Sequence, residues 1–123
     1  MYWNLQPGNI HGPDVAGFLK QVHQHLRNDL ILVWDRYQVH HAAKRQLCDL
    51  LDVAWLRVEW LPPYAPDLNP VEAIWNHTKC VDLADFVPDN LKNLQTAVNK
   101  SFEEECANAP LKRSFFDFAG LEI

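Results

Sequence analysis

Two short strand-like segments, separated by a stretch with helical periodicity, most strongly limit the folds open to this 123-residue chain. Leu30–Trp34 (LILVW) is a continuous apolar run, typical of a strand that is covered on both faces. Leu56–Trp60 (LRVEW) alternates apolar and polar residues, as a strand with one buried side does. Strands that alternate with helices predict an α/β domain with a largely parallel sheet. The helix between the strands is expected to end near Asp52 and to bury one apolar face, made of Val39, Ala43, Leu47, Leu50 and Leu51.

Further elements are expected on either side of this pair of strands. Tyr2–Leu5 is expected to form a short strand before a turn at Pro7–Asn9. Pro13 and Asp14 open a helix, and its apolar face consists of Val15, Phe18, Leu19, Val22 and Leu26. Another helix is expected from Asp89 to about Ala107, with an inward face of Leu91, Leu94, Val98 and Phe102. The tail, 110–123, carries three phenylalanines at 115, 116 and 118 that are able to dock on the body.

The segment Leu61–Trp75, LPPYAPDLNPVEAIW, connects the second strand to a third helix. Two prolines stop the strand, Asn69 suits the cap of the helix, and Pro70 suits its first position. Glu72 therefore falls on the first turn. It lies apart from the face expected to be buried, which consists of Val71, Ile74, Trp75 and Thr78.

Asp35 and Glu72 are candidate metal ligands. Asp35 closes the first of the two strands at its carboxyl end, where sites form in α/β sheets, and Glu72 follows the second strand through one loop. Phosphodiester chemistry commonly uses two metal ions about 4 Å apart, and Mg²⁺ is held by one or two carboxylates with the substrate phosphate. Structural alternatives remain open: Asp35 pairs with Arg36 or a lysine at a strand end, and Glu72 occupies the capping-box position three residues after Asn69.

None of the six histidines shows the spacing of a zinc-ligand repeat. His40 follows Asp35 by five residues and is the histidine best placed to face the same site. His23 and His25 lie on the polar side of the first helix. Solvated or supporting roles are therefore favoured over metal ligation for the histidines.

Charge and cysteine content limit the possible partners. The formal net charge is −5, which counts against strong autonomous DNA binding but not against a carboxylate metal site. The cysteines, at 48, 80 and 106, are odd in number and widely spaced, as expected for reduced thiols of a cytoplasmic protein. No apolar run approaches the ~20 residues of a membrane span, and the first residues do not resemble a signal peptide.

The segment Leu61–Trp75 resembles the signature around the last catalytic acid of mariner-like bacterial insertion-sequence transposases of the Asp-Asp-Glu (DDE) type. Val33–Asp35, with His40 after it, resembles the block around the second acid of that family. The resemblance implies a ribonuclease-H-like fold, as in retroviral integrases, and DNA transposition by metal-dependent strand cleavage and transfer with Mg²⁺ or Mn²⁺. By position, Asp35 would be the second acid and Glu72 the third, and Asn69 and Pro70 would shape the loop that presents Glu72.

Two departures from that family pattern affect the prediction. Arg36 stands where the family often has Asn, and its cation is able to pair with Asp35. The family's first acid lies on a strand far upstream, whereas only Asp14 and Asp29 precede Asp35 here, and neither is expected on a strand. We therefore expect one partial, N-terminally truncated catalytic domain over 1–123, with its core at about 1–105 and a tail at 106–123. The first two strands and a helix-turn-helix region would be missing, and metal would bind weakly or not at all.

A sheet without its first two strands would have open edges, and open edges pair with other chains. The sequence therefore predicts a homodimer or a rearranged sheet. Three functions remain open: a transposase fragment, split or decayed and inactive alone; a non-catalytic regulatory protein that self-associates or binds full-length transposase; and an unrelated α/β binding domain with a chance motif.

Overall fold

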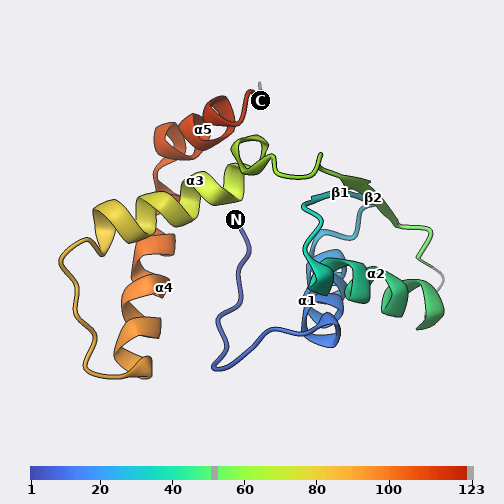
Figure 1. The fold of residues 1–123 in the computed structure, drawn as a ribbon, viewed down its shortest axis with the longest axis horizontal. Coiled ribbons are helices and arrows are strands. Elements are labelled where there is room, and N and C mark those ends of the chain that lie inside the picture. Colours follow the sequence, from blue (N-terminus) through green and yellow to red (C-terminus); the bar gives the residue numbers. More distant parts are fainter. Residues whose placement is uncertain (51–52, 122–123) are drawn as a thin grey trace. The chain divides into compact units, whose positions relative to one another are not determined.

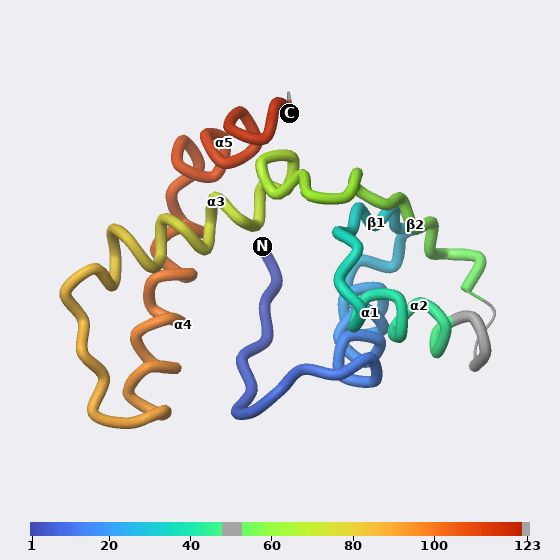
Figure 2. Tube along the Cα trace, viewed as in Figure 1, coloured from blue at the N-terminus to red at the C-terminus, as the bar shows by residue number. Residues whose placement is uncertain are grey.

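The computed structural model describes residues 1–50 and 53–121, and the chain divides into two compact units. Residues 2–64 form a unit with two strands and two helices, here called the sheet unit. Residues 65–123, together with Met1, form a second unit, here called the helical unit, whose described elements are all helical. Figure 1 labels the two strands and the five α-helices of the described residues, and Figure 2 traces the same chain.

The sheet unit is built on two parallel strands, β1 (Leu30–Trp34) and β2 (Leu56–Trp60), with Leu30 opposite Leu56 and Trp34 opposite Trp60. Helix α2 (Gln38–Leu50) makes the connection between them, because parallel strands require a long crossover. Helix α1 (Gly12–Leu26) precedes β1 and packs against α2 (Figure 1). These elements confirm the α/β prediction and the parallel pairing. The prediction that α2 ends near Asp52, with Leu51 inward, falls outside the described residues.

The core of the sheet unit lies between one face of the two strands and both helices. Its most buried members are Ala16 and Leu19 of α1, Trp34 of β1, and Ala43 and Leu47 of α2. Gly12 allows the two helices to approach closely, since a Cβ at this position would lie 3.0 Å from the Cβ of Ala42 and 3.1 Å from the backbone nitrogen of Ala43.

The prediction that β1 is covered on both faces is wrong. Ile31 is 70% exposed and Val33 is 56% exposed, whereas Trp34 is buried. Successive side chains of a strand point to opposite faces, and the buried core joins both helices to the face that carries Trp34. On the other face, Ile31 lies opposite Arg57 and Val33 opposite Glu59. We call this surface, made by these four residues, the open face.

The prediction of a strand at Tyr2–Leu5 is also wrong. These residues form no regular element, and the sheet of the described residues contains only β1 and β2. A strand needs another strand to supply its hydrogen bonds, and no strand of the described residues pairs with this segment. The first regular element is α1, where the Asp14 carboxylate accepts a 2.8 Å hydrogen bond from the backbone N–H of His11.

The helical unit begins with a 3₁₀ turn, η1 (Pro66–Leu68), and helix α3 (Pro70–His77). A π-helical segment, η2 (Thr78–Asp82), continues α3 without a break. Helix α4 (Leu91–Ala107) and helix α5 (Ala109–Phe118) follow, and α5 packs against both α3 and α4. Asn108 alone separates α4 from α5: its N–H closes α4 on the Glu104 carbonyl oxygen, and its side chain accepts the N–H of Leu111 to cap α5.

Several predictions about buried faces in this unit need correction. Val71 and Trp75 are exposed on α3, and Leu91 is exposed at the start of α4, although all three were expected to be buried. Thr78 and Phe102 are buried as expected. The tail docks as a regular helix rather than as a loose aromatic cluster: Phe115 is buried, and Phe118 is exposed.

None of the described helices combines the length and the apolar composition needed to cross a membrane.

Candidate functional site

Asp35 directly follows β1 and is held by the first turn of α2. Its Oδ1 accepts the backbone N–H of Tyr37 at 3.0 Å and lies 2.7 Å from Nδ1 of His40. A carboxylate oxygen only accepts hydrogen bonds, so Nδ1 of His40 carries the proton. The His40 ring is stacked on buried Trp34, with 4.8 Å between ring centroids and 1° between planes. Asp35 is therefore oriented, and its side chain remains 44% exposed.

Arg36 does not neutralise Asp35. Its guanidinium Nε donates to the carbonyl oxygen of Leu61 at 3.2 Å, at the end of β2. The ion pairs of the described residues include His40 with Asp35 but not Arg36 with Asp35. The charge of Asp35 is thus paired with a histidine from α2 rather than with the adjacent arginine.

Glu72 lies on the first turn of α3, where Asn69 and Pro70 begin the helix as expected. The Asn69 side chain accepts the N–H of Val71 at 3.2 Å. The backbone N–H of Asn69, which a capping-box glutamate would bind, instead donates to Pro66 at 2.9 Å. The capping-box interpretation of Glu72 is therefore wrong, and the half-buried carboxylate is not needed to cap its own helix.

The structure groups the candidate residues in two places. Asp35 and His40 contact each other in the sheet unit, and Asn69, Pro70 and Glu72 lie together in the helical unit. The sheet unit ends at Tyr64, a fully exposed residue with a φ of 59°, in the left-handed region that non-glycine residues rarely adopt.

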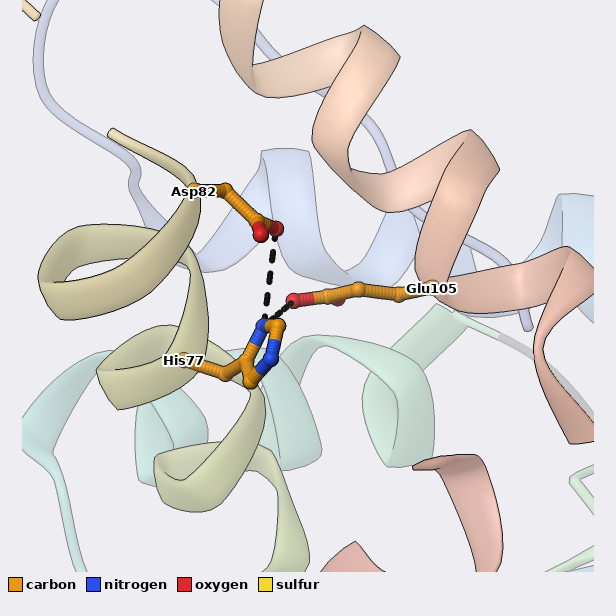
Figure 3. Close-up of side chains that lie close together, drawn as sticks. All are labelled: His77, Asp82 and Glu105. Carbon is orange, nitrogen blue, oxygen red and sulfur yellow. Dashed lines mark hydrogen bonds and ion pairs between the residues drawn. The ribbon is translucent and has the colours of Figure 1, made fainter. Parts of the chain in front are cut away.

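A second group of titratable side chains lies in the helical unit and has no counterpart in the sequence prediction. Nδ1 of His77 lies 3.2 Å from Oε1 of Glu105 and 3.5 Å from Oδ2 of Asp82 (Figure 3). Potential ligand atoms of the three residues all lie within 4.8 Å of one another. His77 ends α3, Asp82 ends η2, and Glu105 comes from α4, so no short sequence motif marks the group.

Glu105 is 1% exposed, and burial raises the pKa of its carboxyl group above the usual value. Hydrogen bonds from Thr78 and His77 oppose that shift in pKa. Oε2 of Glu105 is buried and has no hydrogen-bond partner among the described residues.

These features define an α/β protein with two candidate carboxylates. Asp35 is oriented at the end of a parallel strand, and Glu72 lies on the first turn of the helix that follows the next strand. The family model of the DDE superfamily endonucleases matches residues 5–94, which include both carboxylates. That is most of the chain, and the chain therefore belongs to the DDE superfamily endonucleases. No curated protein and no solved structure matches the chain significantly. Endonucleases of this family act on DNA and normally use a divalent metal ion.

Proposed function

We propose that the chain is a transposase-related protein of the mariner-like insertion-sequence type, with a ribonuclease-H-like catalytic domain that cleaves and transfers DNA strands. The observation that carries this proposal is the presentation of Asp35 at the carboxyl end of β1, oriented by His40 and by the backbone of α2. Parallel pairing of β1 with β2 through the α2 crossover supports the fold assignment. We further propose that 1–123 is one partial catalytic domain, with its core at about 1–105.

Asp35 and Glu72 are suited to hold Mg²⁺ or Mn²⁺. Both are oxygen ligands of the kind these ions prefer, and neither is engaged in an ion pair with lysine or arginine among the described residues. When bound there, the ion would supply Lewis acidity for attack on a DNA phosphodiester. His40 and Tyr37 would fix the Oδ1 side of Asp35, so that Oδ2 is left for the ion. Asn69 and Pro70 would fix the first turn that carries Glu72.

A third carboxylate would complete such a site. The edge of β1 away from β2 pairs with no strand among the described residues, so a strand that carries an acid is able to add there. With two acids alone, metal affinity would be low until DNA supplied phosphate oxygens. At a net charge of −5, DNA binding by the chain alone would also be weak. We propose that the chain is incomplete or inactive as a lone endonuclease.

A second function is favoured by the open face. Exposed Ile31 and Val33 beside an unpaired strand edge suit a regulatory fragment that forms a homodimer or binds full-length transposase. With either function we propose a cytoplasmic location, in which free thiols such as Cys80 and Cys106 would stay reduced.

The test is Mn²⁺ binding in the presence of a DNA oligonucleotide, followed by nicking of supercoiled plasmid in Mn²⁺. Asp35→Asn and Glu72→Gln should each weaken DNA-dependent Mn²⁺ binding and reduce any nicking to background. Asp29→Asn and Glu103→Gln, which make the same chemical changes at exposed positions, should leave both unchanged. Nicking that survives both Asp35→Asn and Glu72→Gln would show that these carboxylates do not carry the reaction.

A further inference from the structure

We propose that His77, Asp82 and Glu105 form a second metal site, for a divalent transition metal of the Zn²⁺ kind, separate from Asp35 and Glu72. The site lies wholly within the helical unit and joins the end of α3 and η2 to α4. It does not depend on the endonuclease function, because neither DNA nor the two carboxylates of the proposed catalytic site take part.

The spacing of the ligand atoms fits a coordination sphere. Zinc bonds to histidine nitrogen and carboxylate oxygen are about 2.1 Å long, so two ligands of a tetrahedral ion lie about 3.4 Å apart. Nδ1 of His77 lies 3.2 Å from Glu105 Oε1 and 3.5 Å from Asp82 Oδ2. Both oxygens thus lie near one ring nitrogen (Figure 3), and an ion that replaces the proton of Nδ1 could reach all three atoms with little movement.

The π-helical segment makes this convergence possible. Residues five apart in an α-helix lie about 140° apart around its axis, so His77 and Asp82 would face different sides. In η2 the N–H of Leu83 bonds instead to the carbonyl oxygen of Thr78 at 2.9 Å, which is the five-residue bond of a π-helix. The wider turn brings Asp82 back over His77. Single π-helical turns are frequent at functional sites.

Glu105 supplies an independent observation that points to a cation as the ligand of this cluster. Its carboxylate is almost fully buried, yet Oε2 has no hydrogen-bond partner among the described residues. A buried carboxylate with an unpaired oxygen is costly unless a positive charge compensates it. Of the two Glu105 oxygens, His77 lies near only Oε1, and it supplies a positive charge only when its ring is protonated. A divalent cation would compensate the negative charges of both Glu105 and Asp82.

Two hydroxyl groups hold the carboxylates in place. Thr78 donates to Oε1 of Glu105 at 3.0 Å, and Ser101 donates to Oδ2 of Asp82 at 2.6 Å. Ser101 has one hydroxyl hydrogen and can therefore donate to only one acceptor. It donates to Asp82, which is nearer than the Thr78 hydroxyl oxygen at 3.3 Å. Such outer partners orient ligands in metal sites and stabilise the deprotonated forms that bind metal.

The ligand set points to the metal class and to an open position. Imidazole suits zinc and its neighbours, whereas Mg²⁺ prefers oxygen ligands alone. His77, Asp82 and Glu105 also line a surface hollow of about 390 Å³, together with Val81, Asn108 and Leu111. An ion can therefore enter from solvent, and a water molecule can fill the fourth position.

The experiment measures binding of Zn²⁺ and Co²⁺ to the full chain by calorimetry and by visible absorption, after treatment with a chelator. The wild-type chain should bind one equivalent at this site. His77→Gln and Asp82→Asn should each lose it, with about a tenfold or greater loss of affinity. Glu104→Gln, which changes an exposed acid on the same hollow, should retain it. Asp35→Asn combined with Glu72→Gln should also retain it, which separates this site from the proposed catalytic one.

Circular dichroism shows whether each variant folds, and a variant that does not fold is replaced by Ser101→Ala, which removes only the hydrogen bond to Asp82 and should weaken binding. Thiolate ligands would give Co²⁺ an intense near-ultraviolet band, so its absence in the bound form excludes Cys80 and Cys106 as the source of affinity. The proposal is overturned if folded wild-type chain binds neither ion, or if binding persists in His77→Gln and Asp82→Asn. The cluster would then be a histidine–carboxylate ion pair only.

Discussion

The role of Asp35 depends on its immediate neighbours. An aspartate after an apolar strand is a common way to end the strand, and its position alone does not distinguish that role from metal binding. The stacking of His40 on Trp34, and the 2.7 Å contact from its ring to Asp35, provide the orientation that a metal ligand requires. In the proposed metal site, His40 would act through Asp35, as a positioning residue.

His40→Phe tests this role, because phenylalanine can keep the stack on Trp34 but loses the hydrogen bond to Asp35. We expect about a 10–100-fold loss of DNA-dependent Mn²⁺ affinity, with partial recovery in His40→Asn. His41→Phe is the matched control, since His41 also stacks on a tryptophan, Trp60, at 4.2 Å. Equal affinity in His40→Phe and His41→Phe would contradict the positioning role.

Asp14 makes one end of α1 sensitive to pH. The hydrogen bond from the backbone N–H of His11 lowers the pKa of the Asp14 carboxyl group below its ordinary value. A carboxyl group whose pKa is lower in the folded chain stabilises the fold above its unfolded pKa, and this contribution is lost as the pH falls through the folded pKa. Asp14→Asn should therefore lower the thermal midpoint at neutral pH and have less effect in strong acid. Asp29→Asn, at an exposed position, is the control.

At the residue scale, sequence reasoning succeeded where local chemistry decides the outcome. Asn69 and Pro70 begin α3 as expected, because cap and first-turn preferences are local. It failed for the cluster of His77, Asp82 and Glu105, because a π-helical turn and packing against α4 bring these residues together. The 22 residues between Asp82 and Glu105 carry no signal of that contact.

Among the elements, α1 and α2 approach each other closely where α1 begins, at Gly12. At Gly12 the space for a side chain is closed by the backbone of α2, whereas at Gly17, in the same helix, a Cβ would meet nothing within 4 Å. The two glycines thus offer a matched pair of substitutions.

Gly12→Ala should lower the free energy of unfolding by about 1 kcal/mol or more, because the contact is with backbone atoms that cannot move aside easily. Gly17→Ala should raise it by about 0.5–1 kcal/mol, because alanine favours a helix interior. Thermal unfolding followed by circular dichroism measures both. A stabilising Gly12→Ala would mean that the two helices can separate at little cost.

At the element scale, the helices α1, α2 and α4 and the strand β2 follow from periodicity in the sequence, and the strand β1 follows from its continuous apolar run. The exposure of one face of β1 could not be predicted from that run. A run of apolar residues shows what a strand is able to bury, but it does not show which layers cover the strand. Helix α5 was expected only as a docking tail, because its phenylalanines were interpreted as a cluster, although Leu111, Phe115 and Phe118 have the spacing of one helix face.

At the scale of the whole molecule, Asp35 belongs to the sheet unit, which ends at Tyr64, and Glu72 belongs to the helical unit. The open face belongs to the sheet unit alone. Its apolar half lies on β1, and its charged half lies on β2, where Arg57 and Glu59 form a 2.6 Å ion pair. A partner that covers this face would therefore lie over β1.

Self-association through β1 is tested by light scattering on purified chain. The wild-type chain should show a dimer population, and Ile31→Lys should weaken the dimer about tenfold or more, because burial of one such side chain contributes about 1.5–3 kcal/mol. Val87→Lys, at an exposed apolar position in the helical unit, should leave it unchanged. A wild-type chain that stays monomeric at all concentrations would contradict the homodimer proposal.

The unpaired edge of β1 also bears on how the chain survives in a cell. Newly made chains with unpaired strand edges aggregate with one another or are bound by chaperones and proteases. Charged residues beside such an edge slow the aggregation. On the open face, β2 carries the charged residues Arg57 and Glu59, which disfavour aggregation, whereas β1 carries only the apolar residues Ile31 and Val33. The amount of soluble protein recovered from cells should therefore rise when a binding partner for β1 is co-expressed. When the chain is made alone, the soluble fraction should fall as the rate of synthesis increases.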